Sequence, residues 1–558
     1  MESHDVVVVG AGPVGLTLAV ELGQRGKSVL VLEKRKQLGK LPKMERCNAR
    51  TMENFRRMGL AERIRRAGLD NDMPMDVFIC DETLVREPLV HHHYPSVSEL
   101  KEQYRETNDG SCPAEPYQLI SQYTLEPLLV DALAELESVE VRFDAEVTSF
   151  IDDGASVTVR YRNSEGVESI VQAAYLVGCD GASSEVRRAL GFELEGDSLL
   201  EMRQALFYSE NLLDRIPIGS GRHYHVADDK SSFLIVQDDK KHFSLHATVA
   251  SDEEMPELFE KILGFPVEYE TLYVGSWRQR LMLSSGYSSG RVFIAGDAAH
   301  LVIPTGGLGM NTGHGDAVDL AWKLAAALEG WGGEGLLASY ELERRPIGAR
   351  NIAASRKATM GRRKWRGMWS PALTDRGPEG DKARAELAAV ADQEQRWSND
   401  LYGIELGYGY LDSPVISYGE DYAIDELGLD FKYTPRSLEG FRLPNVHLED
   451  GTPLQDSLGH EYTILCTGTD AEAAQTLENA IAGIGAPVKT FHVASEDARK
   501  VYGEGYLLLR PDLHIAWRGT RMPEEPAPLA ALVTGHLAVR GCAAHEHPDT
   551  LAALAGGQ

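Results

Sequence analysis

The feature that most constrains this 558-residue chain is a glycine-rich turn between two short apolar runs near its start. The run 5–9 ends in four valines and predicts a buried parallel strand. Apolar residues then recur at helical spacing over 16–26, and the run 28–32 predicts a second strand. Strand, glycine turn, helix and strand in this order predict an α/β unit.

The glycine turn predicts a dinucleotide site. Gly10 allows the tight turn, Gly12 lets a pyrophosphate approach the backbone at the helix N-terminus, and Gly15 lets helix and strand pack closely. Pro13 suits the first helical turn, where its missing N–H costs nothing. Glu33 is placed to accept a hydrogen bond from a ribose hydroxyl. The alternative is a glycine-rich turn of an ordinary α/β domain, and the turn does not show which dinucleotide it binds.

The bulk composition restricts the class of protein. The length predicts two to four domains at ~150 residues each. The formal charge of −29 argues against a nucleic-acid partner and against an anionic membrane surface. The six cysteines include no C-x-x-C, which favours a reducing cytosol. The first strand leaves no room for a signal peptide, and no apolar run approaches the ~18 residues of a membrane span, so we expect a cytoplasmic protein.

Two later stretches repeat the pattern of a strand that runs into a ligand-binding edge. The predicted strand 174–178 leads into Asp180 and a glycine, for which an ordinary β-turn with a helix cap is the alternative. The predicted strand 291–295 leads into Asp297 and then a glycine loop, 304–311, that opens a helix. No phosphate-binding lysine follows, so this loop is not a P-loop. Asp297 would repel phosphate and is expected to accept from sugar or polyol hydroxyls.

Three clusters of charged or polar residues admit alternatives. Arg46 and Arg50 either meet phosphates or lie on a solvated helix face. The three histidines 91–93 predict no metal site, because neighbouring side chains diverge and no acid or cysteine lies at a familiar ligand spacing. The basic run 356–366 is interpreted as a solvated helix face or a partner for internal acids rather than as a nucleic-acid arm.

Three separated motifs together resemble the p-hydroxybenzoate hydroxylase-like, FAD-dependent aromatic monooxygenases. The motifs are 10–15 with Glu33, 179–187 and 296–311. The segment 120–126 looks like the one in which the family's glutamine touches the flavin, and 340–346 is similar to the end of a family helix. The resemblance covers about residues 5–355. Further matches at 403–416 and 510–518 resemble the phenol and chlorophenol hydroxylase subgroup.

The resemblance implies that FAD is the cofactor and assigns residues to it. The expected FAD-binding residues are Gly10, Gly12, Pro13, Gly15, Glu33, Lys34, Arg46, Gln122, Asp180, Asp297, Pro304, Gly307, Leu308, Gly309, Met310 and Asn311. The chain departs from the family pattern at Ser183 and Lys43, where arginines are usual, and at Ile303, where a proline is common. Ser183 weakens any assignment of a nicotinamide site, and Lys43 and Arg46 compete for the diphosphate contact.

The resemblance also implies a reaction. NADPH or NADH would reduce the flavin, and O₂ would then form a flavin C4a-hydroperoxide that hydroxylates a phenolic or polycyclic aromatic ring. The candidates for the residues that assist it are His225, His246 and Arg278, with Tyr224 as a further guess. An FAD-dependent oxidase or tailoring oxidoreductase that does not hydroxylate is the alternative. No metal is expected. A homo-oligomer, a dimer or higher, is expected.

The predicted fold class is α/β, with three kinds of unit. A Rossmann-like FAD-binding domain would take 1–75, 112–185 and 277–355, and an antiparallel-sheet substrate domain would take 76–111 and 186–276. A helical connector is expected over 356–432. The order βαβ-ββα over 433–558 predicts a thioredoxin-like domain without a C-x-x-C motif, since Cys466 stands alone in a strand.

Overall fold

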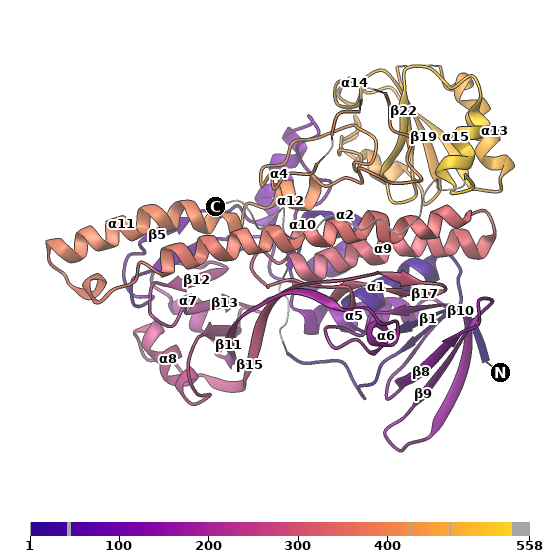
Figure 1. Cartoon of the computed structure of the whole chain (residues 1–558). Helices are drawn as coiled ribbons and strands as arrows, with labels where there is room; N and C mark the ends of the chain where they lie inside the picture. Colours follow the sequence, from indigo (N-terminus) through magenta and orange to yellow (C-terminus); the bar gives the residue numbers. More distant parts are fainter. Residues whose placement is uncertain (1, 42–45, 421, 425, 469, 538–558) are drawn as a thin grey trace.

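The computed structural model describes residues 2–41, 46–420, 422–424, 426–468 and 470–537 of the chain. Two sheets of eight strands each lie side by side, and a smaller four-stranded sheet stands above the two longest helices (Figure 1). The predicted α/β class with an antiparallel second sheet is confirmed. No helix in the described part of the chain is long and apolar enough to cross a membrane.

The first sheet is built on the predicted N-terminal unit. Strand β1 (Glu2–Val9) pairs in parallel with β10 (Glu168–Gly178) and with β2 (Val29–Leu32). Helix α1 (Pro13–Gln24) packs between α5 (Gln122–Ala134) and α9 (Leu308–Glu329). The other strands are β7 (Val139–Arg142), β8 (Glu146–Asp152), β9 (Val157–Arg162), β16 (Ser288–Ser289) and β17 (Val292–Ile294). The buried valines of β1 therefore lie at the centre of the core, as the unbroken apolar run predicts.

The second sheet has one face in a hydrophobic core and one face toward a cavity. Its strands, in spatial order, are β18 (His300–Leu301), β15 (Glu270–Ser284), β11 (Leu194–Tyr208), β14 (His242–Ala247), β13 (Phe233–Val236), β12 (His223–Val226), β4 (Val77–Cys80) and β5 (Val90–His92). Helix α8 (Glu254–Leu263) packs on the core face. Strand β15 is continuous across the predicted domain boundary at 277.

Short elements complete these two units. The ribbon β3 (Arg46–Cys47) and β6 (Gln118–Leu119) pairs near the first sheet. The helices are α2 (Ala49–Arg57), α3 (Ala61–Ala67), α4 (Val97–Glu106), α6 (Glu185–Ala189) and α7 (Leu212–Arg215), with a 3₁₀ turn η1 (Gly296–Ala298).

The longest helix, α10 (Glu334–Arg366), contradicts one expectation from the sequence. The resemblance places a helix end at 340–346, but α10 continues through Pro346 for twenty further residues. A proline inside a helix removes one backbone hydrogen bond. Burial on both sides of the proline offsets this loss, because Tyr340 before it and Ile347 and Ile352 after it all lie in the core. The basic run 356–366 is thus the last part of α10.

A helical connector leads from α10 to the C-terminal unit. Its elements are η2 (Pro371–Thr374), α11 (Pro378–Glu394), η3 (Gln395–Ser398) and α12 (Tyr402–Leu406). The C-terminal unit then contains η4 (Leu454–Ser457), β19 (Tyr462–Thr467), η5 (Ala471–Ala474), α13 (Gln475–Gly483), β20 (Val488–Val493), α14 (Glu496–Tyr502), β21 (Gly505–Leu509), β22 (Ile515–Gly519) and α15 (Pro526–Val533). Its sheet order β20-β19-β21-β22, with β19 and β20 parallel, confirms the predicted thioredoxin-like order.

Buried ion pairs attach the C-terminal unit to helices α2, α9 and α10. The Arg442 guanidinium donates to both carboxylate oxygens of Glu53 on α2, and Arg50 donates to the same carboxylate. Arg510 contacts Glu343 of α10 and Asp319 of α9. Burial disfavours a charged Glu53, but Arg442 and Arg50 outweigh this effect and hold its pKa below the ordinary value. The contact between Arg442 and Glu53 thus depends on a charged carboxylate.

Replacing Arg442 by methionine should destabilise the protein by about 3–5 kcal/mol at pH 7, because the variant leaves a buried carboxylate without its main partner. A glutamate in the unfolded chain titrates near 4.5 and Glu53 in the folded chain titrates lower. The pair therefore stabilises the fold fully above about pH 4.5, and its contribution is lost as the pH falls through the lower, folded-state pKa. In thermal denaturation, the difference in stability between the wild type and Arg442→Met should shrink as the pH is lowered from 7 to 4.

The matched control for this experiment is Arg499→Met. Arg499 lies in the same unit and pairs with Glu504 at 3.7 Å on the surface, and exposed pairs contribute about 0–1 kcal/mol. A loss for Arg442→Met as small as that of the control, or an equal loss at pH 4 and pH 7, would contradict the role given to the buried pair.

Candidate active site

A cavity of about 1670 Å³ lies between the first and second sheets. It is lined from one side by the glycine turn after β1 and from the other by the open face of the second sheet. Ordinary small-molecule sites occupy ~300–1,000 Å³. The cavity is therefore large enough for a dinucleotide and a second molecule together.

The glycine turn has the geometry that a bound pyrophosphate requires. Gly10 has φ +106°, and a Cβ atom there would lie 2.5 Å from the Cys179 carbonyl oxygen. A Cβ at Gly15 would lie 2.1 Å from the Gly10 carbonyl oxygen. A Cβ at Gly12 would meet no protein atom within 4 Å, although Gly12 caps α1 and lines the cavity. Two glycines are thus needed by the fold, whereas Gly12 leaves space for a ligand.

Glu33 is fixed beside this turn. Its carboxylate accepts from the Ala11 N–H at 2.9 Å and from Arg35 Nε at 2.8 Å. Burial alone would raise the pKa of Glu33, but the hydrogen bonds from Arg35 and Ala11 outweigh it and lower the pKa. The carboxylate is therefore ionised at neutral pH and suited to accept from ribose hydroxyls. Lys34, which follows it, lines the cavity with an exposed side chain.

The second glycine loop supplies the opposite wall. Pro304, Gly307, Gly309 and Met310 line the cavity where α9 begins, and the free N–H groups of a helix N-terminus attract negative charge. Gly307, the residue before the helix, has φ +65°. The loop is held in place by Ser355, whose hydroxyl donates to the carbonyls of residues 303 and 305.

The side chains of Leu308 and Asn311 do not line the cavity, and the resemblance places only their backbone beside the flavin. The Leu308 side chain packs in a core cluster with Leu401 and Ile404. The Asn311 amide accepts from the Asn48 N–H at 2.9 Å and donates to the Arg46 carbonyl at 3.0 Å. Helical geometry explains the difference, because residues one and four positions into α9 share a face that points away from the cavity. Their side chains position the loop.

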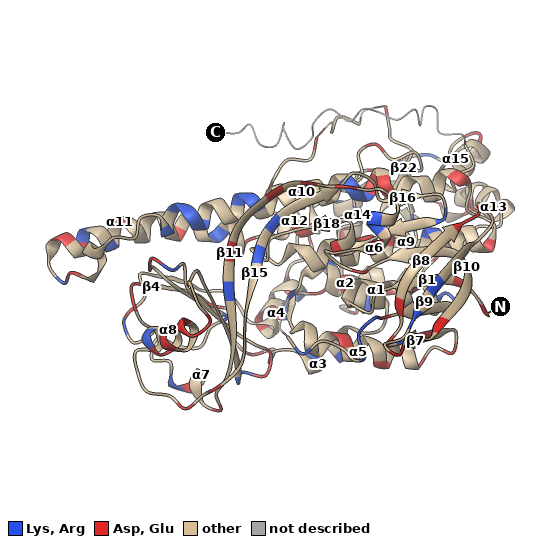
Figure 2. Cartoon of the chain, turned by 60° about the horizontal axis from the view of Figure 1, so that its bottom comes forward, with Lys and Arg blue, Asp and Glu red and all other residues tan. Residues whose placement is uncertain are grey.

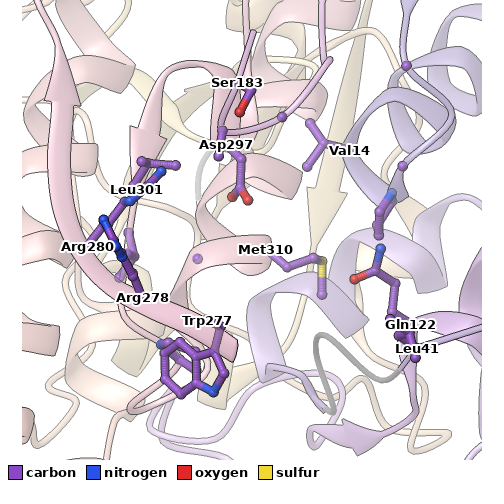
Figure 3. Close-up of a pocket in the computed structure, with 18 of the residues that line it drawn as sticks. Val14, Leu41, Gln122, Ser183, Trp277, Arg278, Arg280, Asp297, Leu301 and Met310 are labelled. Carbon is purple, nitrogen blue, oxygen red and sulfur yellow. The ribbon is translucent and has the colours of Figure 1, made fainter. Parts of the chain in front are cut away.

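Asp297 and Met310 face one space, between Gln122 on one side and Trp277 and Arg278 of β15 on the other (Figure 3). Gln122 begins α5 and donates to Glu126 at 2.6 Å. The turn that carries Asp297 is fixed by the buried Asp316, which accepts from the Gly296 N–H and pairs with His300 and Arg344. The structure therefore brings the predicted Gln122 and Asp297 into one cavity from distant parts of the chain.

Two other predicted residues have structural partners. Asp180 lines the cavity, and its carboxylate also accepts from the backbone N–H groups of Glu185 and Val186 at the start of α6, whose N-cap is Ser184. Arg46 lines the cavity, but its guanidinium pairs with Glu405 of α12 at 2.6 Å. Lys43, its competitor for a diphosphate contact, lies outside the described residues.

An aromatic row crosses the open face of the second sheet. Phe233 of β13 pairs in register with His246 of β14, and their rings stack at 4.8 Å and 4°. The Trp277 indole meets His246 edge-on at 5.7 Å. All three side chains line the cavity. A flat apolar wall with a histidine in it suits an aromatic ring that needs a nearby acid or base.

The structure separates the histidines and the tyrosine that the sequence proposed. His246 lines the cavity, but His225 does not, although it belongs to the same side of the sheet. The end of α10 covers His225, whose ring nitrogens lie near Arg366 and Gln395. Tyr224 points to the opposite face of the sheet, where its hydroxyl donates a hydrogen bond to the Gly219 carbonyl. Neither His225 nor Tyr224 lines the cavity, and their part in the reaction stays a prediction that this geometry does not favour.

Two sequence-family models match this chain. One, described as FAD binding domain, matches residues 3–355, and another, described as aromatic-ring hydroxylase, C-terminal, matches residues 436–537. The chain belongs to the FAD-dependent aromatic-ring hydroxylases. The glycine turn with the free space over Gly12, the ionised Glu33 and the start of α9 fit FAD as the cofactor of this hydroxylase.

Relatives of this hydroxylase span nearly its whole length. FAD-dependent monooxygenase apdD of Emericella nidulans is 30% identical, over 95% of this chain and 90% of its own. Aklavinone 12-hydroxylase RdmE of Streptomyces purpurascens is 32% identical, over 93% and 96%. The structure of the rebeccamycin biosynthetic enzyme RebC with reduced flavin, 31% identical, superposes with a TM-score of 0.86 over 96% of this chain and 99% of that one.

Arg278 of the hydroxylase lies at the cavity but is mostly exposed. It pairs with Glu201 across the β11–β15 ladder at 2.9 Å, and 62% of its side chain is accessible. A solvent-exposed ion pair of this kind has little effect on a reacting group. We therefore give Arg278 no catalytic role.

The histidine run of the hydroxylase lies outside the cavity lining and differs from its prediction. His91 and His93 approach Asp76, with His91 Nε2 2.6 Å and His93 Nδ1 3.3 Å from Asp76 Oδ2. The sequence reasoning did not include Asp76, the residue before β4, which meets both rings because residues two apart on an extended segment share a face. These ligand atoms lie within 4.8 Å of one another, as a metal site would need. The expectation that no metal binds stays a prediction.

Proposed function

We propose that this hydroxylase inserts one oxygen atom of O₂ into a phenolic or polycyclic aromatic ring at the expense of NADPH or NADH. The observation that carries the proposal is the single cavity that joins the glycine turn to the aromatic row. FAD, when bound, supplies the redox chemistry. The relatives that hydroxylate aklavinone and phenol support the substrate class.

The residues of the cavity would divide the work between cofactor and substrate. Gly10, Gly12 and Glu33 would hold the adenosine half of FAD, and the N-terminus of α9 would stabilise negative charge on its ring system. The stacked pair of Phe233 and His246 would bind the substrate ring. His246 would take the phenolic proton, since a carbon ortho or para to a phenolate is richer in electrons.

The aromatic row would also keep water from the reacting atoms. Phe233 and Trp277 present ring faces and edges toward the cavity, and His246 is 9% exposed. A substrate seated on this row would close the remaining access from the second sheet. Because Ser183 takes the place of the family's arginine, no residue is assigned to the nicotinamide. We propose only that the nicotinamide binds transiently.

A panel of phenols and polycyclic aromatics tests the proposal. Each compound is mixed with the FAD-loaded protein under air, and NADPH and NADH consumption and product mass are followed. A hydroxylase should consume the reductant faster with a substrate and release a product heavier by one oxygen atom. Hydrogen peroxide and a dehydrogenated product, formed from the substrate and O₂ without consumption of NADPH or NADH, would instead support the oxidase or tailoring alternative.

A further inference from the structure

Arginines gather at the substrate end of the cavity in a chain of formal charge −29. Figure 2 shows basic residues along the last part of α10 and along the neighbouring strand β15. Over residues 200–280 and 359–398, the described lining has one carboxylate, Glu201, which pairs with Arg278. The arginines of the same lining are Arg222, Arg278, Arg280, Arg362, Arg363 and Arg366. In a chain with more acidic than basic residues, a random lining would contain more carboxylates than arginines.

Arg366 belongs to this cluster and has no carboxylate partner among the described residues. Its guanidinium donates to the Ser231 carbonyl and lies 3.2 Å from His225 Nδ1. Its Nε is buried and has no hydrogen-bond partner among the described residues. Burial lowers the pKa of Arg366 to about 10, against a small opposing effect of Asp228. The side chain as a whole is half-buried, and an anion that reached such a guanidinium without a carboxylate partner would be bound strongly.

The aromatic row places this charge beside the substrate ring. Phe233 stacks on His246, and the guanidinium carbons of Arg366 and Arg362 lie 5.4 Å and 5.7 Å from the centre of the same phenyl ring. Arg222 immediately precedes β12, the strand next to β13, and lines the same cavity. A ring seated on the aromatic row would therefore bring an attached carboxylate to planar donors, which bind carboxylates through two parallel hydrogen bonds.

We propose that the cavity selects aromatic substrates that carry a carboxylate, and that Arg366 and Arg362 of α10, with Arg222, hold that group. This inference rests on the proposed function for the identity of the ring. The carboxylate would fix which edge of the ring meets the cofactor. The basic run at the end of α10, which the sequence interprets as a solvated helix face or a partner for internal acids, would then bind an acid of the substrate.

Matched pairs of ligands test the proposal by binding alone. The probes are hydroxybenzoic, hydroxynaphthoic and hydroxyanthracene carboxylic acids, each beside its methyl ester, titrated into the FAD-loaded protein and read from the flavin absorption spectrum. At least one acid should bind ten-fold or more tightly than its ester, the effect of a hydrogen bond to a charged group. Equal affinities throughout, or no binding of any acid, would overturn the proposal.

Variants of α10 locate the effect. Arg366→Met and, separately, Arg362→Met should reduce the acid-to-ester ratio at least ten-fold and leave ester binding unchanged. Lys364→Met is the control, because Lys364 lies on the same helix, pairs with Glu394 and is absent from the lining. If Arg366→Met does not fold, the acid-to-ester affinity ratios of the wild type and of Arg362→Met test the proposal. A higher KM for NADPH with an unchanged acid-to-ester ratio would assign the arginines to the dinucleotide and overturn the proposal.

The binding readout separates this inference from the proposed function. Preferential binding of acids without any hydroxylated product would refute the hydroxylation and leave the anion site in place. Hydroxylation of neutral phenols with no preference for acids would support the proposed function and refute the anion site.

Discussion

Replacing Gly12 by valine is expected to abolish FAD binding and to leave the fold in place. A Cβ at this position meets no protein atom within 4 Å, so the new side chain occupies only the space above the helix N-terminus. That space is where a pyrophosphate contacts the free N–H groups of α1. We expect FAD affinity to fall more than 100-fold, measured as flavin bound per chain after dialysis against dilute FAD.

The stability cost of this substitution should be small. Valine is a poorer N-cap than glycine, and this costs about 1 kcal/mol of helix stability. Gly483→Ala is the control, since Gly483 ends α13 in the C-terminal unit and a Cβ there also meets no atom within 4 Å. The control should retain FAD. Full retention of flavin by Gly12→Val would show that the dinucleotide lies elsewhere.

Replacing His246 by glutamine should lower the rate of hydroxylation about 100-fold, within the range for loss of a general acid or base. Glutamine keeps a polar side chain on the aromatic row but cannot accept the phenolic proton. Reductant consumption should fall less than product formation, because the reduced cofactor still reacts with O₂ when the substrate is not activated. Product yield per NAD(P)H oxidised is the measurement.

His242→Gln is the matched control for His246. Both histidines belong to β14, but His242 pairs with Asp239 at the strand start and does not line the cavity. Its variant should keep both the rate and the yield. Equal losses in the two variants would indicate damage to the strand, and an unchanged yield in His246→Gln would remove His246 from the reaction.

Local features of the cofactor site could be predicted from the sequence because each depends on neighbours in the chain. The turn after β1 follows from four valines, a tight glycine and a helix within fifteen residues. The positive φ of Gly10 and the close packing of Gly15 agree with the roles that the spacing assigns. The order βαβ-ββα of the last unit was predictable for the same reason.

Features that depend on distant contacts could not be read in the same way. Strand alternation places His223 and His225 on one face, but only the packing of α10 decides that His225 is covered. The hydrogen bonds that turn Asn311 toward Asn48 join residues 263 positions apart. The resemblance implies a helix end at 340–346, and tertiary burial lets α10 continue through Pro346. The arginines of α10 carry no local signal of a cavity, because a solvated helix face has the same pattern.

Isotope labelling tests the central claim, FAD-dependent aromatic hydroxylation, most directly. The FAD-loaded protein is supplied with NAD(P)H, ¹⁸O₂ and the aromatic acid or phenol that most stimulates reductant consumption, and the product is weighed by mass spectrometry. We predict a ring hydroxyl that contains one atom of ¹⁸O, with the second atom in water. A product whose new oxygen comes from water, or one that has lost hydrogen and gained no oxygen, would contradict the account.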